Sequence, residues 1–201
     1  MITNNIIKKG FRVVPTILVS FFLLAGALSG IYFYEKHNYS EAANQFNKIS
    51  KNDYNKVLKV NLHSPFFLTQ KLIKYFRSNG SIVNISSFSA ISGGPFSSHY
   101  AISKSAIDGL TKNLAIYFSK KKIRVNGISP GPTLKSKNQT IAQFKRQISL
   151  TPMKKQINLD EINKAIDYFI SNQSVTGEIL TIDSGQSLGW AHSKSKNFSK
   201  D

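Results

Sequence analysis

Residues 80–104 read "GSIVNISSFSAISGGPFSSHYAISK". The apolar run after Gly80 predicts a short buried strand, and the segment that begins at Tyr100 has the apolar spacing of a helix. Ser87 therefore lies just beyond the carboxyl end of the strand, where open α/β sheets bind their ligands. Tyr100 and Lys104 lie one helical turn apart, so their side chains share one face of the helix.

These three side chains suggest acid–base chemistry. A phenol titrates at about pH 10, so Tyr100 exchanges protons at neutral pH only when a nearby cation favours its phenolate. Lys104 can supply that cation. The hydroxyl of Ser87 can then hold a carbonyl or alcohol oxygen while Tyr100 gives or takes the proton.

Strand-like and helix-like segments alternate around this stretch. Residues 53–76 have mostly helical apolar spacing, interrupted by Pro65. The segment "KIRVNGI" at 122–128 predicts a strand, a second clear helix begins at Asn158 with a capping-box pattern, and "GEILTI" at 177–182 predicts the last strand. Strands separated by helix-length segments indicate parallel pairing with right-handed crossovers, and therefore a doubly wound α/β sheet.

Composition narrows the function classes. With 201 residues, 41% of them hydrophobic, the chain can bury one sizeable core. The 27 Lys and Arg against 10 Asp and Glu leave a net charge of +17, but the lysines are scattered, which favours a solvated basic surface over nucleic-acid binding. The absence of Cys excludes disulfides and thiolate zinc sites. The four His residues lack metal-ligand spacing, so no metal site is expected.

The segment 13–34 carries no charge and allows two interpretations. An uncharged apolar stretch of about twenty residues can span a bilayer as a helix, and Lys8, Lys9 and Arg12 precede it as they precede a signal anchor. Pro15 and the β-branched beginning equally suit a buried parallel strand followed by a turn. Periodicity alone does not decide between them.

The chain resembles the short-chain dehydrogenase/reductase family, in which a Ser is followed thirteen residues later by the Tyr of a Tyr-x-x-x-Lys motif. Ser87, Tyr100 and Lys104 fit this spacing without a gap, which favours Ser87 over Ser86 as the catalytic serine. The resemblance runs from about residue 50 to residue 188. Within the family it is strongest to the pteridine and dihydromonapterin reductases, with 3-oxoacyl-carrier-protein reductases next.

The resemblance implies roles for further residues. Asn61, in "KVNLHSPF", falls on the family's helix Asn, which holds a water in the proton relay from the Lys. The segment "RVNGISPGPT" resembles the family's penultimate strand and its Pro-Gly turn, and Ser184 stands where the family usually has Gly. The cofactor implied is NADPH or NADH. The residues expected to contact it are Tyr100, Lys104, Pro130, Gly131 and Thr133.

The departures from the family concern the cofactor. The sequence contains no TGxxxGxG turn, the element whose glycines let the backbone approach the pyrophosphate at a helix N-terminus. The family's third strand also has no counterpart. We therefore expect an incomplete Rossmann-like sheet and impaired cofactor binding. The expected organisation is a degenerate N-terminal segment over 1–49, a catalytic domain over 50–190 and a disordered basic tail over 191–201.

Three functions follow as hypotheses. The first is a cytoplasmic NAD(P)H-dependent reductase of a small carbonyl or pterin-like substrate. The second is a truncated, inactive relative that binds a partner. The third is a membrane-anchored protein in which 13–34 spans the bilayer. The family usually forms homo-oligomers through the helices that hold Asn61 and Tyr100, so the resemblance implies a second copy of the chain as a partner.

Overall fold

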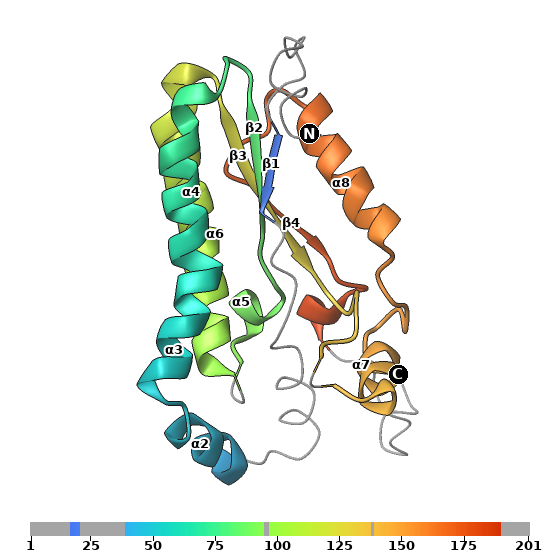
Figure 1. Cartoon of the computed structure of the whole chain (residues 1–201). Coiled ribbons are helices and arrows are strands. Elements are labelled where there is room, and N and C mark those ends of the chain that lie inside the picture. Colours follow the sequence, from blue (N-terminus) through green and yellow to red (C-terminus); the bar gives the residue numbers. More distant parts are fainter. Residues whose placement is uncertain (1–16, 21–38, 95–96, 138, 190–201) are drawn as a thin grey trace, which may run out of the picture.

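The computed structural model of the chain describes residues 17–20, 39–94, 97–137 and 139–189. Its described strands form one parallel sheet in the order β1-β2-β3-β4 (Figure 1). The strands are β1 (Ile17–Ser20), β2 (Ser81–Ile85), β3 (Arg124–Pro130) and β4 (Ile179–Ile182). The α-helices are α2 (Tyr39–Asn47), α3 (Lys51–Leu58), α4 (Ser64–Leu72), α5 (Ser89–Ser92), α6 (Ser98–Phe118), α7 (Ile141–Ser149) and α8 (Leu159–Ser171). The shorter turns are η1 (Lys59–His63), η2 (Ile73–Tyr75), η3 (Ser119–Lys121) and η4 (Gln186–Leu188).

Helices cover both faces of the sheet, which confirms the doubly wound α/β fold (Figure 1). Every residue of β2 and β3 is buried, as is typical of parallel strands with a helical layer on each side. Successive side chains of a strand point to opposite faces. Ile82 and Val125 therefore pack under α6 with Phe118, while Val83 and Ile128 pack under α8.

The helix α8 begins where the sequence predicts it. The Asn158 side chain accepts a hydrogen bond from the Asp160 N–H, and the Glu161 side chain accepts one from the Asn158 N–H. These bonds satisfy two donors that a helix N-terminus leaves free. Behind this cap, the side chains of Ile162 and Phe169 enter the apolar core. Burial of this helix face and its cap together fix α8 against the sheet.

Pro65 does not break the helical segment as the sequence suggests. The turn η1, just before it, is a π-helix, and Pro65 occupies one of the first positions of α4. Proline lacks an N–H and clashes with the carbonyl one turn earlier, and a wider π-turn accommodates this. The carbonyl of Lys59 accepts from the backbone N–H and the hydroxyl of Ser64. α3, η1 and α4 therefore follow one another without a break.

The strand β1 lies inside the uncharged segment 13–34. It pairs in parallel with β2, with Ile17 opposite Ser81 and Ser20 opposite Asn84. Of the two interpretations of this segment, residues 17–20 thus adopt the strand. Its other residues and the predicted tail 191–201 lie outside the described residues. Among the helices that the structure describes, none has the length and apolar character required to cross a bilayer.

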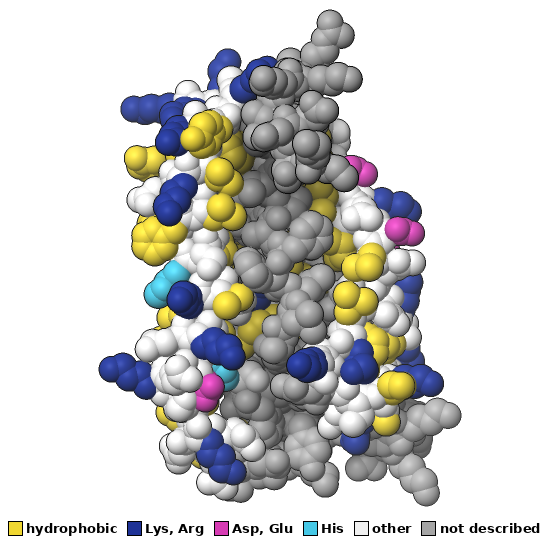
Figure 2. All heavy atoms as spheres, in the orientation of Figure 1, with side chains coloured by type: hydrophobic (Ala, Val, Ile, Leu, Met, Phe, Trp, Pro, Cys, Tyr) yellow, Lys and Arg dark blue, Asp and Glu magenta, His cyan; other side chains and the backbone are white. Residues whose placement is uncertain are grey.

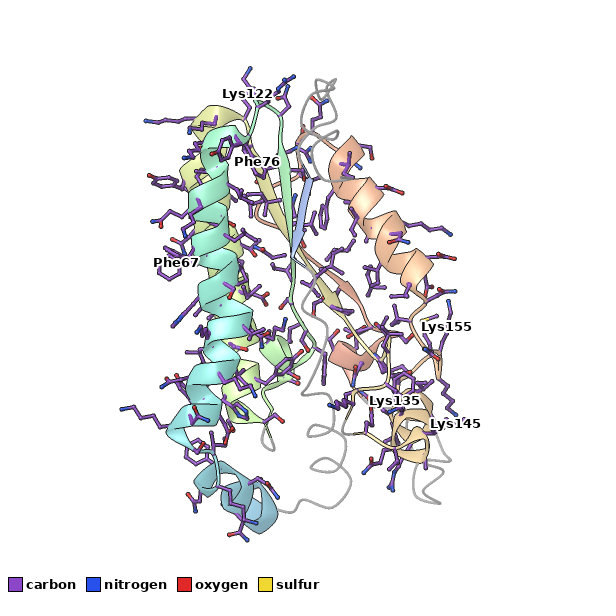
Figure 3. All side chains as sticks on the ribbon, viewed as in Figure 1. Phe67, Phe76, Lys122, Lys135, Lys145 and Lys155 are labelled. Atoms are coloured by element: carbon purple, nitrogen blue, oxygen red, sulfur yellow. The ribbon has the colours of Figure 1, made fainter. Side chains whose placement is uncertain are left out.

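The surface is basic without one dominant patch in the view shown. Figure 2 shows Lys and Arg side chains distributed over both helical layers, with apolar side chains between them. Some large apolar side chains on α4 are exposed, including Phe67 (53%), which points away from the sheet, whereas Phe76 lies between α4 and the strands (Figure 3). This arrangement fits the solvated basic surface expected from the composition.

Candidate active site

The candidate site lies at the carboxyl edge of the sheet. After β2, the Ser86 N–H donates to the carbonyl of Ile128 at 2.7 Å. After β3, the Gly131 N–H donates to the carbonyl of Ile182 at 2.9 Å. These bonds extend the strand pairing by one residue. Ser87 therefore follows the end of β2, and the turn that begins at Gly131 follows the end of the neighbouring strand β3, as the sequence predicts.

Ser87 and Tyr100 contact each other across this edge. The Ser87 Oγ accepts a hydrogen bond from the Ser89 N–H at 3.2 Å, which fixes the serine at the first turn of α5. Burial raises the pKa of the Tyr100 phenol above its ordinary value, and the hydrogen bond with the Ser87 side chain partly offsets this rise. The phenol is therefore protonated at neutral pH and can act as an acid.

Lys104 is buried one turn further along α6. Its side chain is only 2% exposed, its Nζ donates to the carbonyl of Ile85 at 2.9 Å, and the same nitrogen lies 5.6 Å from the centroid of the Tyr100 ring. Burial lowers the pKa of Lys104 from 10.5 to about 8, and attraction to Asp108 opposes this fall. The structure thus brings Ser87, Tyr100 and Lys104 together.

Asn61 joins the same group from the π-turn η1. Its side chain is buried, and its Nδ2 donates to the Ser103 Oγ at 3.0 Å. The Ser103 hydroxyl in turn donates to the carbonyl of Tyr100 at 2.7 Å. The amide group of Asn61 therefore ties η1 to the helix that carries Tyr100 and Lys104. The role of Asn61 in a proton relay stays a prediction.

Ser103 was missed by the sequence analysis. It lies within the Tyr-x-x-x-Lys motif and is fully buried, at 0% exposure. A small hydroxyl residue three positions after Tyr100 is a weak signal, because a helical serine more often bonds a carbonyl of its own helix. Ser103 does this and also accepts from Asn61, which the sequence alone does not indicate.

The turn after β3 is closely packed against the turn after β4. A Cβ at Gly131 would lie 2.7 Å from the Asp183 Cα, so only glycine fits there. Thr133 is buried, and its hydroxyl donates to the Gly131 carbonyl at 3.1 Å. Packing against Asp183 thus accounts for Gly131, and contact of Pro130, Gly131 and Thr133 with a cofactor stays a prediction.

The turn after β4 explains why glycine suits position 184. Ser184 has a φ of 57°, a left-handed conformation that glycine adopts without strain. Its hydroxyl donates to the Lys155 carbonyl at 2.7 Å, and the Asp183 carboxylate accepts from the Gly185 and Ser187 N–H groups. These bonds hold the left-handed turn although a Cβ is present.

The segment between β3 and α8 forms a small lobe beside the site, built on α7. A capping box joins Thr140 and Gln143 at the start of α7, and buried Gln139 donates to Gln147 at 3.0 Å. Lys135, in the loop before α7, and Lys145, on α7, lie in this lobe (Figure 3). Within the described part of the chain, no three His, Cys, Asp or Glu residues are grouped to bind a metal.

The donors at this edge suit the ribose hydroxyls of a nicotinamide nucleotide. A lysine ammonium has three N–H donors, and the Lys104 ammonium donates to the Ile85 carbonyl, which leaves donors for a ligand. The Tyr100 ring lies beside this ammonium, and the Ser87 side chain bonds the Tyr100 phenol. The described residues include no glycine-rich turn that would hold a pyrophosphate. The residues present therefore fit the nicotinamide end of such a cofactor.

Comparison with protein families gives one match that covers more than half of the chain. The family model described as enoyl-(acyl carrier protein) reductase matches residues 35–187. Among curated proteins, the chain is 33% identical over 144 residues to the 3-oxoacyl-[acyl-carrier-protein] reductase FabG of Thermotoga maritima, with 69% of this chain and 58% of that protein covered. It is 36% identical over 133 residues to the short-chain dehydrogenase/reductase homolog YusR of Bacillus subtilis, covering 61% and 97%.

Solved structures give a consistent picture. FolM alternative dihydrofolate reductase 1 from Brucella canis, complexed with NADP, superposes with a TM-score of 0.72 and 28% identity, covering 89% of this chain and 65% of that one. A 4-hydroxyisoleucine dehydrogenase complexed with NADH gives a TM-score of 0.67 and 29% identity, covering 86% and 69%. The chain spans about three fifths of the length of the FabG relatives that it matches.

Proposed function

Because this chain belongs to the short-chain dehydrogenase/reductase family, we propose that it is an NAD(P)H-dependent oxidoreductase that reduces a small carbonyl or pterin-like substrate. The observation that carries the proposal is the group at the carboxyl edge of the sheet. There Ser87 bonds Tyr100, and the buried ammonium of Lys104 lies beside the Tyr100 ring. The names of FolM and FabG support a pterin-like or a 3-oxoacyl substrate.

The chain's own residues then have distinct roles. The hydroxyl of Ser87 donates a hydrogen bond to the substrate oxygen and orients it. Tyr100 transfers its phenolic proton to that oxygen. The Lys104 cation stabilises the phenolate that remains and holds the ribose of the cofactor with its free donors. When bound, the nicotinamide supplies the hydride that the carbonyl carbon accepts.

Proton donation by Tyr100 depends on the charge of its neighbour. Burial raises the pKa of Tyr100, which makes the phenolate product unfavourable. A protonated Lys104 offsets this cost because opposite charges attract more strongly away from water. We therefore propose that reduction requires Lys104 in its ammonium form.

The test is a titration of NADPH, then NADH, into the purified protein, followed by nicotinamide fluorescence and thermal stabilisation. Lys104→Ala should weaken binding, whereas Lys145→Ala, an exposed lysine on α7, should leave it unchanged. A screen of carbonyl, pterin and 3-oxoacyl substrates follows. In that screen Tyr100→Phe should lower turnover about 10²- to 10⁴-fold. Tyr117→Phe, which alters an exposed tyrosine of the same helix, should not.

The alternative function, an inactive relative that binds a partner, is decided by the same titration. The sequence contains no TGxxxGxG turn, so the pyrophosphate contacts of the family are in question. Saturable binding that depends on Lys104 supports the reductase. A folded sample that binds neither nucleotide at millimolar concentration would contradict it and favour the partner-binding alternative.

We also propose that the chain forms a homo-oligomer through α4 and α6. Large apolar side chains are exposed on both helices. These are Phe66, Phe67, Leu68, Ile102, Ile116 and Tyr117. A second copy that covers them would remove this apolar surface from water. Light scattering should show a dimer or larger assembly that Phe67→Glu weakens, and a monomer at all accessible concentrations would contradict the proposal.

A further inference from the structure

A polar cluster lies directly behind the candidate active site. Tyr100, Lys104 and Asp108 follow one another at intervals of four residues on α6, so the three side chains form one stripe along the helix. Ser86, 2% exposed, precedes Ser87 at the end of β2. The stripe therefore continues beyond the residues that the family motif names, and Asp108 is its third member.

Two oxygens of this cluster are buried without a hydrogen-bonding partner. They are the Oγ of Ser86 and the Oδ1 of Asp108. Buried polar atoms without a partner are rare and call for an explanation. The Ser86 hydroxyl nevertheless lies near enough to lower the pKa of Asp108, although burial raises that pKa more strongly. A serine hydroxyl can donate and a carboxylate can only accept, so the two groups are complementary.

Asp108 also acts on Lys104. Burial disfavours the ammonium form of Lys104, and attraction to Asp108 favours it. The only ion pair shorter than 4.0 Å within the described ranges joins Lys155 to Glu161, so Asp108 acts on Lys104 from a longer distance. The attraction between the two charges remains effective at this distance because water is largely excluded around Lys104. The exposed Lys112, four residues further along α6, also attracts the Asp108 carboxylate and lowers its pKa.

Other charged groups lie on the elements packed against α6, namely α3, η1, β3 and η3. They are Lys51, Asp53, Lys56, Lys59, His63, Lys120, Lys121 and Arg124. The Arg124 guanidinium donates to carbonyls at the end of α8. Among the described residues, the charges that act on Asp108 are those of Lys112 and Lys104. Asp108 is thus the acidic group that acts on the buried ammonium.

We propose that Asp108, oriented by Ser86, is a positioning residue that keeps Lys104 in its ammonium form beside Tyr100 at neutral pH. It does not touch the substrate and acts only through Lys104. The consequence for catalysis rests on the proposed reductase function, because that function needs the cation. The coupling of Asp108 to Lys104 does not rest on it and can be measured without cofactor or substrate.

The test is an NMR titration of Lys104 in protein labelled with ¹³C-lysine, with the Lys104 signal assigned from its loss in Lys104→Met. We expect the titration midpoint of Lys104 to fall by about one pH unit in Asp108→Asn. Asp108→Glu, which restores the charge, should bring it back toward the wild-type value. Asp167→Asn, which removes an exposed acid from α8, should leave it unchanged. An unchanged midpoint in folded Asp108→Asn would overturn the proposal.

Ser86→Ala gives a second route to the same conclusion if Asp108→Asn does not fold. Without the Ser86 hydroxyl the Asp108 carboxylate is no longer held toward Lys104, so the Lys104 midpoint should fall, but by less than in Asp108→Asn. An equal midpoint in Ser86→Ala and wild type would contradict the orienting role of Ser86.

A turnover measurement then separates the two proposals. If the wild type reduces a substrate, its turnover should fall as the pH rises and Lys104 loses its proton. In Asp108→Asn this fall should begin at a lower pH, with KM for the substrate unchanged. If the wild type reduces no substrate while the Lys104 midpoint still shifts in Asp108→Asn, the reductase proposal fails and the role of Asp108 stands.

Discussion

The two faces of the sheet bury different kinds of side chain. Under α8, the core consists of Val83, Ile85, Ile128 and Phe169 packed together, with Ile162 from the helix. Under α6, an apolar cluster is accompanied by buried polar side chains. These polar residues are Asn61, Asn84, Ser103, Lys104 and Thr111. The sheet therefore has one face that is mainly apolar and one in which polar groups are enclosed.

Polar groups under α8 exist too, but they bond differently. Arg124 donates to the carbonyls of Phe169, Ile170 and Asn172 at the end of α8, and Asn126 donates to the carbonyl of Val175. Arg124 thus satisfies carbonyls that the end of α8 leaves free, and Asn126 satisfies a carbonyl of the loop that follows. Under α6, Asn61 bonds another side chain, and Lys104 reaches the carboxyl edge. The comparison indicates that the α8 face mainly supplies stability, whereas the α6 face holds the side chains of the candidate site.

The largest effect should come from the α8 face. Phe169 is 0% exposed at the centre of that core, so Phe169→Ala should lower the free energy of unfolding by about 3 to 5 kcal/mol. Phe46→Ala, on the exposed surface of α2 and outside the proposed oligomer interface, should change it by less than about 0.5 kcal/mol. Urea unfolding measures both. Equal losses in the two variants would break the comparison, because Phe46 lies outside the core.

Much of this division could be predicted from sequence because it depends on local patterns. Three such patterns are the mostly apolar run of β2, the helical spacing of Tyr100 and Lys104, and the cap at Asn158. Each requires only a few neighbouring residues. Gly131 was expected at the turn after β3, but for contact with a cofactor. Its close approach to the Asp183 backbone gives it a packing role, and its contact with a cofactor stays a prediction.

The remaining features could not be predicted because they depend on distant residues or on competing local signals. The Asn61 to Ser103 bond joins positions 42 residues apart. The helix α7, which begins with a capping box at Thr140, has no counterpart among the elements that the sequence predicts. Pro65 was expected to interrupt a helix, but the preceding π-turn keeps the helical segment continuous.

A smaller effect should follow from opening the polar network under α6. Ser103→Ala removes the acceptor of the buried Asn61 amide, and an unpaired buried donor costs about 1 to 3 kcal/mol. Asn61→Ala should cost a similar amount, and the double variant should cost less than the sum of both. Urea unfolding of the four proteins gives the coupling energy. Strict additivity would contradict the bond between the two side chains and leave the two faces less distinct.

The smallest effect should be a pH dependence of stability that arises from the α6 face alone. Burial lowers the pKa of Lys104 from 10.5 to about 8. Below pH 8, folded and unfolded chains both keep the proton, and folding must bury a charge. Between pH 8 and 10.5 the folded protein releases the proton first while the unfolded chain still binds it. The free energy of unfolding should therefore rise with pH in this window, by roughly 1 kcal/mol per pH unit.

Lys104→Met should lack this rise, because it has no proton to release. Urea unfolding from neutral pH to about pH 9 measures it, below the range in which the tyrosines ionise. Parallel pH profiles in both proteins would mean that Lys104 is not buried as a cation, and the α6 face would then resemble the apolar face that it is contrasted with.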